Sequence, residues 1–386
     1  MDDRVKNSSF VIVGHSVYPA RAGDLRRYLL ENGAAQLAYI NHDFSTLKTR
    51  RSHLQLYRRG RLEAKRSSPD YRFLPEPLVN IKDIIYTLWW MIFVVKRADV
   101  YIGLSGFDTA CGVILKSLHR IRTLVYYSID FMPVRFTNRF LNEVYHRVNE
   151  FALKRSTEIW DLSPRMAEGR RDVRGLRAGD LPPQYLVPSG IWPDSLRCPF
   201  DEVSRSELVF IGELSEKTGV QLVLEAMPEI LAEIPSFVFR VIGTGPYEIQ
   251  LKALAARLGI EPHVVFEGLL LDETAVAEKL AHAAAGVALY DKSKDDFTYY
   301  ADPGKLKTYL SAGLPILLTD LPWNARELEA AGCAVVVEYD KSSVAKSVIE
   351  MLKDEDRLIA RRESVEAYAM NLDWNRMLDE CMDRLL

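Results

Sequence analysis

The sequence predicts an α/β protein that consists of two doubly wound domains in series. Short apolar, strand-like runs alternate with amphipathic helical segments, and the connections between them are short. This alternation indicates parallel sheets with helices on both faces. It is interrupted once, from Ile191 to Ser206, where Pro193 and Pro199 mark a linker. We therefore expect two domains that face each other across a cleft, which is the default position for a binding site.

The first strand is expected at Phe10 to Gly14, an apolar run that ends in glycine. A polar loop and a helix from about Asp24 to Glu31 follow it, and Gln36 to Ile40 form the next strand. The loop lacks the GxGxxG spacing, so no dinucleotide-binding fingerprint is indicated. His15 follows the strand directly. It is either a packed or capping loop residue, or a base or proton donor.

A second polar side chain follows a later strand of the first half. Thr123 to Tyr127 form this apolar strand, and Asp130 comes shortly after it. Because the strand ends of an open sheet face the binding cleft, Asp130 is a candidate acid or base. Aspartates at such positions also cap turns, so a structural role stays open. Further strands are expected at residues 99–103 and 158–161, and further helices at residues 108–118 and 137–154.

The second half repeats the alternation. Leu208 to Gly212 form its first strand, and a helix from Val220 to Ile234 follows. Phe237 to Gly243 form a strand that ends in the glycine-rich sequence GTGP. Further helices are expected up to residue 258, at residues 273–284 and at residues 342–352, and further strands at residues 264–268, 287–290 and 334–338.

A strand–loop–helix–strand unit from Ala288 to Glu327 is the most informative part of the second half. Asp302 and Pro303 predict a helix start, since aspartate caps the first turn and proline is tolerated at the first helical position. Gly313 supplies the left-handed C-terminal stop. The loop from Asp291 to Ala301 is polar and aromatic and is longer than a plain connection requires, which indicates a site.

Two lysines begin this helix. Lys305 and Lys307 lie in its first turn, at the positive end of the helix dipole, where cations are disfavoured. In one interpretation they are solvated and are balanced by Asp295, Asp296 and Asp302. In the other, the free N–H groups of the first turn and a lysine bind an anion such as a diphosphate. The spacing leaves both interpretations open.

The composition is that of a soluble globular protein, with 48% hydrophobic and 27% charged residues. The four cysteines lack metal-ligand spacing, which indicates reduced thiols in a cytosolic compartment. The N-terminus begins with acidic residues and has no long apolar core, so no signal peptide is expected. Residues 1–195 contain 30 basic residues against 20 acidic ones, and the remainder contains 20 against 33. The N-terminal half is therefore expected to face an anionic partner.

The segment from Lys48 to Arg66 is strongly basic. It is either a solvated loop and helix face, or a contact with an anionic membrane surface, where each basic residue contributes about 1 kcal/mol. Nucleic acid is a third partner of the same charge, but no base-stacking or groove-reading motif is present, so we do not expect it. The basic residues are Lys48, Arg50, Arg51, Arg58, Arg59, Arg61, Lys65 and Arg66.

The most apolar run extends from Ile84 to Val95. Its twelve residues are too few to cross a bilayer, which takes about 20 residues. We expect a buried helix, part of which can line an apolar acceptor cleft. Trp89 and Trp90 are adjacent, so they cannot both face the same way.

The C-terminal half resembles family 4 of the retaining glycosyltransferases, which have the GT-B fold of two Rossmann-like domains. The matching sequences occur in the family's order between Leu208 and Met377, and the match is closest from Pro303 to Asp320. The N-terminal half matches in outline, through the first strand–loop–helix and the sequence YYSID. The matching sequences of the C-terminal half are FIGELSEKTGVQLVLEAM, VIGTGP, VVFEGLL, GVALY, PGKLKTYLSAGLPILLTD and LDWNRML.

The resemblance implies an acceptor-side domain at residues 1–195 and a nucleotide-sugar-binding domain at residues 196–365. Family members return their last helix to the first domain, which here implies residues 366–386, including Trp374. The implied reaction moves a sugar, with retention, from a nucleotide-diphosphate donor to a saccharide or lipid-linked acceptor in polysaccharide or glycoconjugate biosynthesis. No metal or other cofactor is implied. The candidate catalytic residues are Asp130 and His15, and the implied donor contacts are Gly14, Lys217, Gly243, Gly245, Tyr290, Asp302, Lys305, Leu306 and Thr308.

The sequence departs from the family where the donor is bound. The family has an arginine after the glycine of the first C-domain strand and a lysine before the next glycine, but this chain has Glu213 and Thr218 there. The family's pair of glutamates falls on Tyr300 and Thr308. Lys305 matches a lysine of a family branch whose helix opens with Pro-x-Lys, which implies a role in neutralising phosphate.

These departures keep a second function open, namely a non-catalytic GT-B protein that binds nucleotide, sugar or a partner subunit. A sugar-nucleotide epimerase of the same architecture is a third alternative, but it requires an acid and a base that the sequence does not identify. We expect a cytoplasmic protein that docks peripherally at the inner face of the membrane through its basic N-terminal half.

Overall fold

The computed structural model describes residues 3–16, 21–43, 49–192, 197–294 and 296–386. The chain forms two compact units. Unit 1 comprises Met1–Pro188 and Trp374–Leu386, and unit 2 comprises Ser189–Asp373. Some predicted features lie outside the described residues: part of the loop after the first strand (17–20), Lys48, part of the linker (193–196) and Asp295.

Unit 1 contains an eight-stranded sheet in the order β4-β3-β2-β1-β5-β6-β7-β8. The pairs from β2 through β1 to β8 are parallel, whereas β2–β3 and β3–β4 are antiparallel. The apolar runs at the predicted strand positions form its buried centre. The strands are β1 (Ser9–Ser16), β2 (Gln36–Asp43), β3 (Ser52–Arg58), β4 (Arg61–Ser67), β5 (Ala98–Gly103), β6 (Ile121–Ser128), β7 (Glu158–Asp161) and β8 (Gln184–Leu186).

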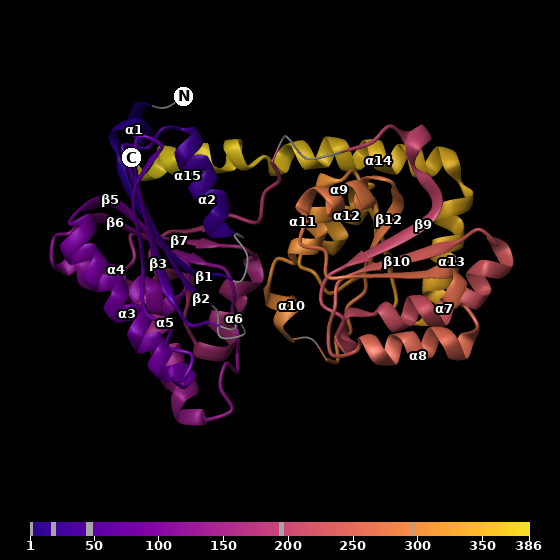
Figure 1. Cartoon of the computed structure of the whole chain (residues 1–386), viewed down its shortest axis with the longest axis horizontal. Helices are drawn as coiled ribbons and strands as arrows, with labels where there is room; N and C mark the ends of the chain where they lie inside the picture. The colour runs from indigo at the N-terminus through magenta and orange to yellow at the C-terminus, as the bar shows by residue number, and fades with distance from the viewer. Residues whose placement is uncertain (1–2, 17–20, 44–48, 193–196, 295) are drawn as a thin grey trace. The chain divides into compact units, whose positions relative to one another are not determined.

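The helices of unit 1 begin where the sequence provides caps. Ser105, Asn138 and Ser163 each accept a backbone N–H bond with the side chain, at the starts of α4, α5 and α6. In Figure 1 the C-terminal helix α15, in yellow, lies beside α2. The helices are α1 (Asp3–Asn7), α2 (Arg21–Glu31), α3 (Glu76–Trp90), α4 (Gly106–Ser117), α5 (Arg139–Arg155), α6 (Pro164–Arg174) and α15 (Trp374–Leu385), and a π-helical turn, Met91–Val95, continues α3.

The basic segment forms a β-hairpin, so the prediction of a loop and a helix face was wrong. Arg59 and Gly60 have φ angles of 44° and 76°, as a two-residue hairpin turn between β3 and β4 requires. Leu54 and Leu56 are buried and alternate with more exposed residues, which is the period of a strand. The charged residues concentrate on β4, an edge strand, where charge discourages pairing with other chains.

The apolar run belongs to a longer helix than its own length indicated. Together α3 and the π-helical turn form a 20-residue helix, Glu76–Val95, that is long and apolar enough to cross a membrane by length and composition, although 39% of its most apolar 18-residue stretch is buried. The expected buried helix is therefore half right. Trp90 is buried, whereas Trp89 is exposed, as their adjacency required.

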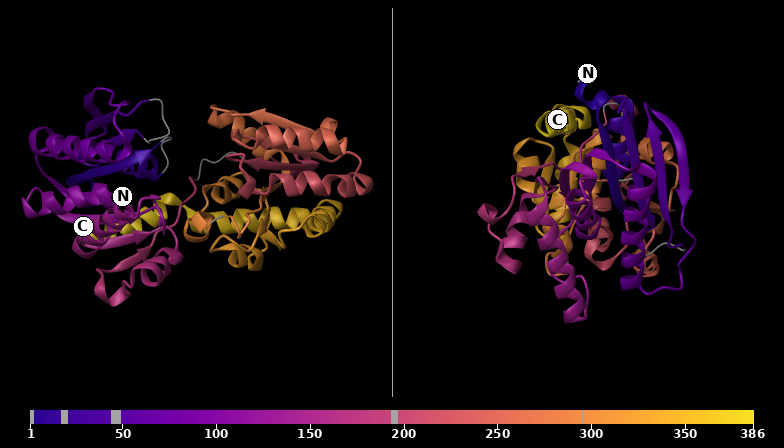
Figure 2. Two further views of the ribbon diagram at one scale, coloured as in Figure 1. Left: turned by 90° about the horizontal axis from the view of Figure 1, so that it is seen from below. Right: turned by 90° about the vertical axis from the view of Figure 1, so that its left-hand side faces the viewer.

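Unit 2 contains a six-stranded parallel sheet in the order β11-β10-β9-β12-β13-β14. Figures 1 and 2 show helices on both faces of this sheet. The predicted α/β fold with doubly wound parallel sheets is confirmed. The strands are β9 (Ser204–Ile211), β10 (Val238–Ile242), β11 (Val264–Gly268), β12 (Ala283–Ala288), β13 (Ile316–Thr319) and β14 (Ala334–Val337).

The helices of unit 2 agree with the predicted alternation, with three additions, one of which is the short helix α12 before β14. A short helix, α10, lies in the segment predicted as a long loop, and α14 follows α13 after a break at Asp354. The helices are α7 (Val220–Glu233), α8 (Glu248–Leu258), α9 (Glu273–Ala281), α10 (Asp296–Tyr300), α11 (Gly304–Ser311), α12 (Ala325–Ala330), α13 (Lys341–Lys353) and α14 (Glu355–Ala369).

The two crossings between the units lie at Pro188 and Trp374 rather than at the predicted residues 195 and 366. Ile191 donates its N–H to the Leu372 carbonyl at 2.7 Å and forms a β-bridge with Asp373. These bonds fasten the start of unit 2 to its end. The residues that precede Trp374 continue α14 and its final turn on unit 2, which moves the second crossing to Trp374.

Candidate functional site

The strand order of each sheet defines a topological switch point. This is a pair of adjacent strands whose following connections run toward opposite edges of the sheet. In unit 2 this point lies between β9 and β12, because β9 leads to β10 and β11 whereas β12 leads to β13 and β14. In unit 1 it lies between β1 and β5. Ligands of open α/β sheets bind at the carboxyl ends of the strands at such points. The candidate site residues are therefore those at the ends of these four strands.

Two glycine-containing loops meet at the carboxyl edge of unit 2. Gly212 follows β9 and Gly243 follows β10, and their φ angles of 141° and 137° favour glycine. A Cβ atom on Gly243 would lie 1.9 Å from the Gly212 carbonyl oxygen, and one on Gly245 would lie 2.2 Å from that of Leu214. Backbone bonds of 3.0 Å from Gly212 to Ile242 and from Leu214 to Thr244 hold the loops together. The glycines thus allow the two loops to pack closely against each other, and they place bare backbone at this edge.

Lys305, in the first turn of α11, lies at this switch point. Its Nζ is 4.1 Å from the centre of the Phe210 ring, on β9, and 5.2 Å from that of Tyr290, after β12. A Cβ atom on Gly212 would lie 3.3 Å from the same Nζ. Since the missing Cβ leaves room above Gly212, the ammonium group lies directly beside the glycine loop. The sequence prediction of a cation at a helix start beside the site agrees with this geometry.

Asp302 does not cap α11, so this part of the prediction was wrong. The cap position is Pro303, and the Asp302 carboxylate is fully buried. It accepts hydrogen bonds from the Ser189 N–H at 2.9 Å and from Lys307 Nζ at 2.9 Å. Trp323 Nε1 donates to the same carboxylate at 3.1 Å. Lys307 is therefore a buried ion-pair partner and not a solvated lysine, whereas Gly313 ends the helix with φ of 75° as predicted.

The remaining predicted donor residues divide by position. Tyr290 follows β12, and its N–H donates to Thr319 Oγ1 at 2.9 Å. Lys217 lies in the loop after β9, where its carbonyl accepts the Asp291 N–H at 3.2 Å. Leu306 is fully buried in the core, so its side chain cannot reach a ligand. Thr308 Oγ1 donates to the Gly304 carbonyl at 3.2 Å.

The predicted residues Gly14, His15 and Asp130 lie in unit 1. His15, near the end of β1, is the centre of a cluster at the switch point of that sheet. Its Nε2 is 3.1 Å from the Asp83 carboxylate, on α3, and its Nδ1 is 3.4 Å from that of Asp108, in the first turn of α4.

A second histidine belongs to the same cluster. His42, on β2, contacts the other Asp83 oxygen at 3.0 Å and Thr87 Oγ1 at 2.9 Å. Lys82 Nζ also contacts Asp83, at 2.5 Å. The Asp83 carboxylate therefore has three basic neighbours.

The two histidines of this cluster differ in charge. Burial lowers the pKa of His15, but the facing carboxylates of Asp108 and Asp83 outweigh burial and raise it to about 10. Burial lowers the pKa of His42, against the opposing effect of Asp83. At neutral pH His15 is a cation and His42 is neutral. Because both ring nitrogens of His15 face carboxylates, His15 can act as a fixed cation or proton donor but not as a base.

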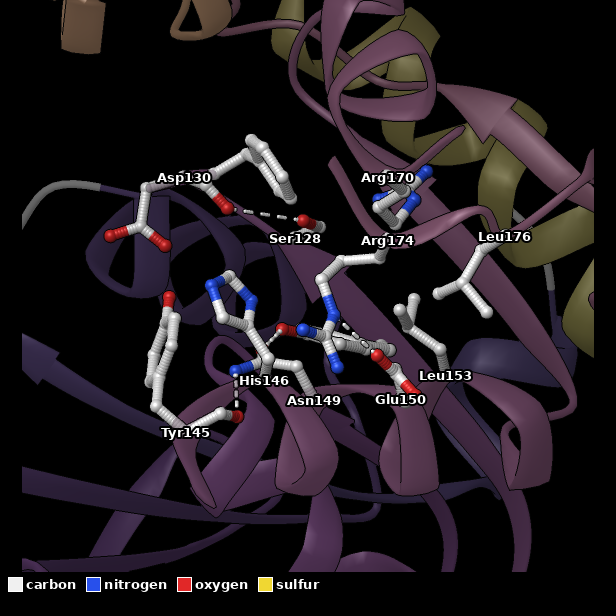
Figure 3. Close-up of a pocket in the computed structure, with 12 residues that line it drawn as sticks. Ser128, Asp130, Tyr145, His146, Asn149, Glu150, Leu153, Arg170, Arg174 and Leu176 are labelled. Atoms are coloured by element: carbon white, nitrogen blue, oxygen red, sulfur yellow. Dashed lines mark hydrogen bonds and ion pairs between the residues drawn. The ribbon is translucent and has the colours of Figure 1, made fainter. Parts of the chain in front are cut away.

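Asp130 lines a pocket between β6, α5 and α6 (Figure 3). Burial raises the pKa of its carboxyl group, while Arg135 and His15 oppose that rise. Arg170 lies across the pocket and pairs with Asp161 at 2.8 Å, but its buried Nε has no hydrogen-bond partner within the described residues. The other polar residues of the lining are Tyr126, Ser128, Tyr145, His146, Asn149, Glu150 and Arg174. A carboxyl group whose pKa is raised by burial is more easily protonated than an exposed one, which suits proton transfer to or from a hydroxyl.

The sequence analysis missed Asp83, Asp108 and His42. They lie 68 (Asp83), 93 (Asp108) and 27 (His42) residues after His15, so no local spacing shows the cluster. The available signal was the charged pair Lys82–Asp83 at the border of an apolar helix, since charges at such positions are buried only when paired. In the described ranges no group of His, Cys, Asp and Glu side chains has an arrangement that could hold a metal ion.

Comparison with known proteins places these sites in context. Residues 205–354 match the family model of the group 1 glycosyl transferases. This segment contains the glycine loops and Lys305. The C-terminal unit thus resembles a group 1 glycosyl transferase domain over the matched segment.

Individual relatives agree with this assignment. A GDP-mannose-dependent alpha-(1-6)-phosphatidylinositol monomannoside mannosyltransferase of Mycolicibacterium smegmatis is 32% identical over 62 residues, 16% of each chain. The putative colanic acid biosynthesis glycosyltransferase WcaL of Salmonella typhimurium is 24% identical over 190 residues, 47% of this chain and 46% of that protein. The chain thus spans less than half the length of these curated relatives.

The fold is shared over the whole chain. The structure of Anabaena HepE in complex with UDP superposes with a TM-score of 0.67 and 13% identity, over 97% of this chain and 100% of that chain. Such neighbours are GT-B glycosyltransferases, so the predicted GT-B fold is confirmed.

Proposed function

We propose that the protein is a glycosyltransferase that moves a sugar, with retention, from a nucleotide-diphosphate donor to a saccharide or lipid-linked acceptor. The single observation that carries the proposal is the position of Lys305 beside the bare backbone of Gly212 at the switch point of unit 2. The family match of residues 205–354 and the UDP bound by HepE support a nucleotide-sugar donor. The reaction belongs to polysaccharide or glycoconjugate biosynthesis, in the cytoplasm.

The chemistry follows from where charge develops. As the bond between sugar and diphosphate breaks, negative charge accumulates on the leaving diphosphate. A preorganised ammonium group and the backbone N–H groups of a helix N-terminus stabilise this charge more than they stabilise the ground state. Lys305 and the first turn of α11 supply both. The acceptor hydroxyl is assigned to unit 1, where Asp130 and the His15 cation are the groups suited to proton transfer and charge stabilisation.

A non-catalytic protein that binds a nucleotide or sugar is the second candidate. Two observations favour it: Tyr300 and Thr308 occupy the places where the resemblance expects carboxylates, and the Thr308 hydroxyl is bonded to the Gly304 carbonyl. Labelled nucleotide sugars with UDP, GDP and ADP as carriers distinguish the candidates. Release of labelled sugar, or its transfer to a saccharide or lipid acceptor, supports the enzyme. Nucleotide binding without release or transfer across the panel supports the second candidate.

Substitution of Lys305 by alanine is expected to weaken binding of the nucleotide diphosphate. A charge-assisted contact contributes about 1–3 kcal/mol, so the Kd should rise about 5- to 150-fold. Isothermal calorimetry with UDP and GDP measures this change. Lys346→Ala is a matched control, because Lys346 is a highly exposed lysine on α13. Unchanged affinity in Lys305→Ala would exclude this position as the diphosphate site.

A further inference from the structure

The outer face of α3 presents a continuous apolar stripe. Leu78, Ile81, Ile85, Trp89 and Phe93 follow one another at intervals of three or four residues, so they lie on one face of the helix. Each is between 46% and 66% exposed. Scattered exposed apolar side chains are ordinary on a protein surface, but a row of five along one helix indicates an interaction surface.

The inner face of the same helix carries buried polar side chains among apolar ones. Lys82 contacts Asp83, donates to Ser52 Oγ at 2.9 Å and donates to the Arg50 carbonyl at 3.2 Å. Asp83 and Thr87 bond to the histidine cluster. A helix that crossed a bilayer would carry Lys82 and Asp83 to hydrocarbon depth and would lose these partners. The helix therefore remains in unit 1, and its stripe can meet only a surface that lies alongside it.

Cations border the stripe on the side of the hairpin. Leu54 and Leu56 of β3 belong to the same core as Trp90, so they point toward the face that α3 covers. Cross-strand partners share a face of a sheet. Arg66 pairs with Leu54, and Arg61 pairs with Arg58, which lies two residues after Leu56. Arg58, Arg61 and Arg66 therefore lie on the α3 face of the hairpin, and all three are exposed.

Two further cations lie directly after the helix, whereas one arginine of the basic segment is bonded to other residues of unit 1. Lys96 and Arg97 follow the π-helical turn directly and are exposed. Arg50, by contrast, has its guanidinium bonded to the Leu74 carbonyl and its N–H bonded to Asp70 at 3.0 Å. The basic residues on the side of the stripe are therefore Arg58, Arg61, Arg66, Lys96 and Arg97, and Arg50 is not one of them.

We propose that the α3 stripe docks on an anionic phospholipid bilayer, with the helix lying in the interface and Arg61, Arg66, Lys96 and Arg97 meeting the headgroups. An apolar stripe bordered by cations is the pattern of interfacial helices. A second copy of the chain fits less well, because residues 1–195 contain 30 basic against 20 acidic residues and two copies would bring like charges together. Asp83, on the inner face of the docked helix, contacts His15. Docking therefore places α3 between the lipid and the His15 cluster.

The proposal adds a membrane contact to the proposed function. It rests on that function only for the purpose of docking, which is access to a lipid-linked acceptor. Docking itself involves no residue of the donor site. Binding to vesicles and binding to UDP can therefore fail independently, and each is measured on the same variants.

The test is flotation of the full chain with vesicles of phosphatidylcholine alone or mixed with phosphatidylglycerol. We expect flotation with the mixed vesicles, and at least a tenfold loss of bound protein in Ile85→Glu/Phe93→Glu and in Arg61→Ser/Arg66→Ser. Lys65→Ser is the matched control for charge, because Lys65 pairs with Gln55 and lies on the opposite face of β4. Leu269→Glu/Leu271→Glu is the control for exposed apolar residues, on unit 2. Both controls should float as the unchanged chain does.

A second readout locates the contact. Lipids brominated on their acyl chains should quench tryptophan emission of the unchanged chain, and Trp89→Phe should remove most of that quenching. Equal flotation with neutral and mixed vesicles, flotation with neither, or wild-type flotation of Ile85→Glu/Phe93→Glu would overturn the proposal. A dimer in solution that Ile85→Glu dissociates would also overturn it, because the stripe would then be an interface between copies. An unchanged chemical unfolding transition of unit 1 shows that the stripe variants are folded, and unchanged UDP affinity shows the same for unit 2.

Discussion

Substitution of Asp302 by alanine is expected to lower the free energy of unfolding of unit 2 by about 3–5 kcal/mol. The carboxylate is fully buried and is the partner of the Lys307 ammonium group, which is also buried. Removal of one member of a buried ion pair leaves the other charge without compensation in a medium of low polarity. The Ser189 N–H and the Trp323 indole N–H would lose their acceptor as well.

The measurement is urea unfolding followed by circular dichroism, with the transition of unit 2 assigned by hydrogen exchange. Asp320→Ala is the matched control, because Asp320 forms an exposed ion pair with Arg326 at 3.0 Å. Exposed pairs contribute at most about 1 kcal/mol. The double variant Asp302→Ala/Lys307→Met should regain much of the lost stability, since it removes both charges. A loss below about 1 kcal/mol in Asp302→Ala alone would show that the pair does not stabilise this unit.

Asp302 also shows what sequence reasoning could and could not provide. An aspartate followed by proline is a common helix start, so the cap was a fair local prediction. The competing interactions come from Ser189 and Trp323, which lie 113 and 21 residues away. A buried lysine at the fourth position of the helix outweighs a cap, because its charge would otherwise be unpaired. Nothing in the local sequence distinguishes Lys307, which is buried, from Lys305, which faces the site.

The fold was more predictable than the site because it depends on periodicity. Strand and helix periods are visible in short windows, and they located the elements of both sheets within a few residues. The hairpin was missed because its edge strand is almost entirely exposed, so that only Leu54 and Leu56 carried the period of two. The position of Lys305 beside Phe210 and Gly212 depends on the order of strands in the sheet, which periodicity does not contain.

Substitution of Asp83 by alanine is expected to destabilise unit 1 by about 3–5 kcal/mol near neutral pH. Its carboxylate contacts Lys82, His15 and His42, all within 3.1 Å. Without it, Lys82 is a buried cation with two oxygen acceptors, Ser52 Oγ and the Arg50 carbonyl, and no charge partner among its described contacts. Asp172→Ala is the control, since Asp172 pairs with Arg171 on the exposed side of α6. Chemical unfolding of unit 1 at one pH measures the difference.

The pH dependence separates the electrostatic role of Asp83 from simple loss of packing. In the unchanged protein the pKa of His15 is about 10, against 6.5 for an unperturbed histidine. A group whose pKa is raised by folding stabilises the folded state fully below its unfolded pKa, and this contribution is lost as the pH rises through the folded pKa. The contribution of His15 should therefore be complete below pH 6.5 and should disappear as the pH approaches 10.

Asp83→Ala removes one of the two carboxylates that face His15, so the folded pKa should fall and the loss of stability should begin at a lower pH. Asp83→Asn should give the same displacement while preserving volume, because it too removes the charge. NMR titration of the His15 ring in the unchanged protein and in both variants measures the pKa directly. If the ring titrates at the same pH in all three proteins, Asp83 does not hold the charge of His15, and Asp108 alone is responsible. A displaced titration that is equal in the alanine and asparagine variants identifies the carboxylate charge as the cause, since the two side chains differ in size but share the loss of that charge.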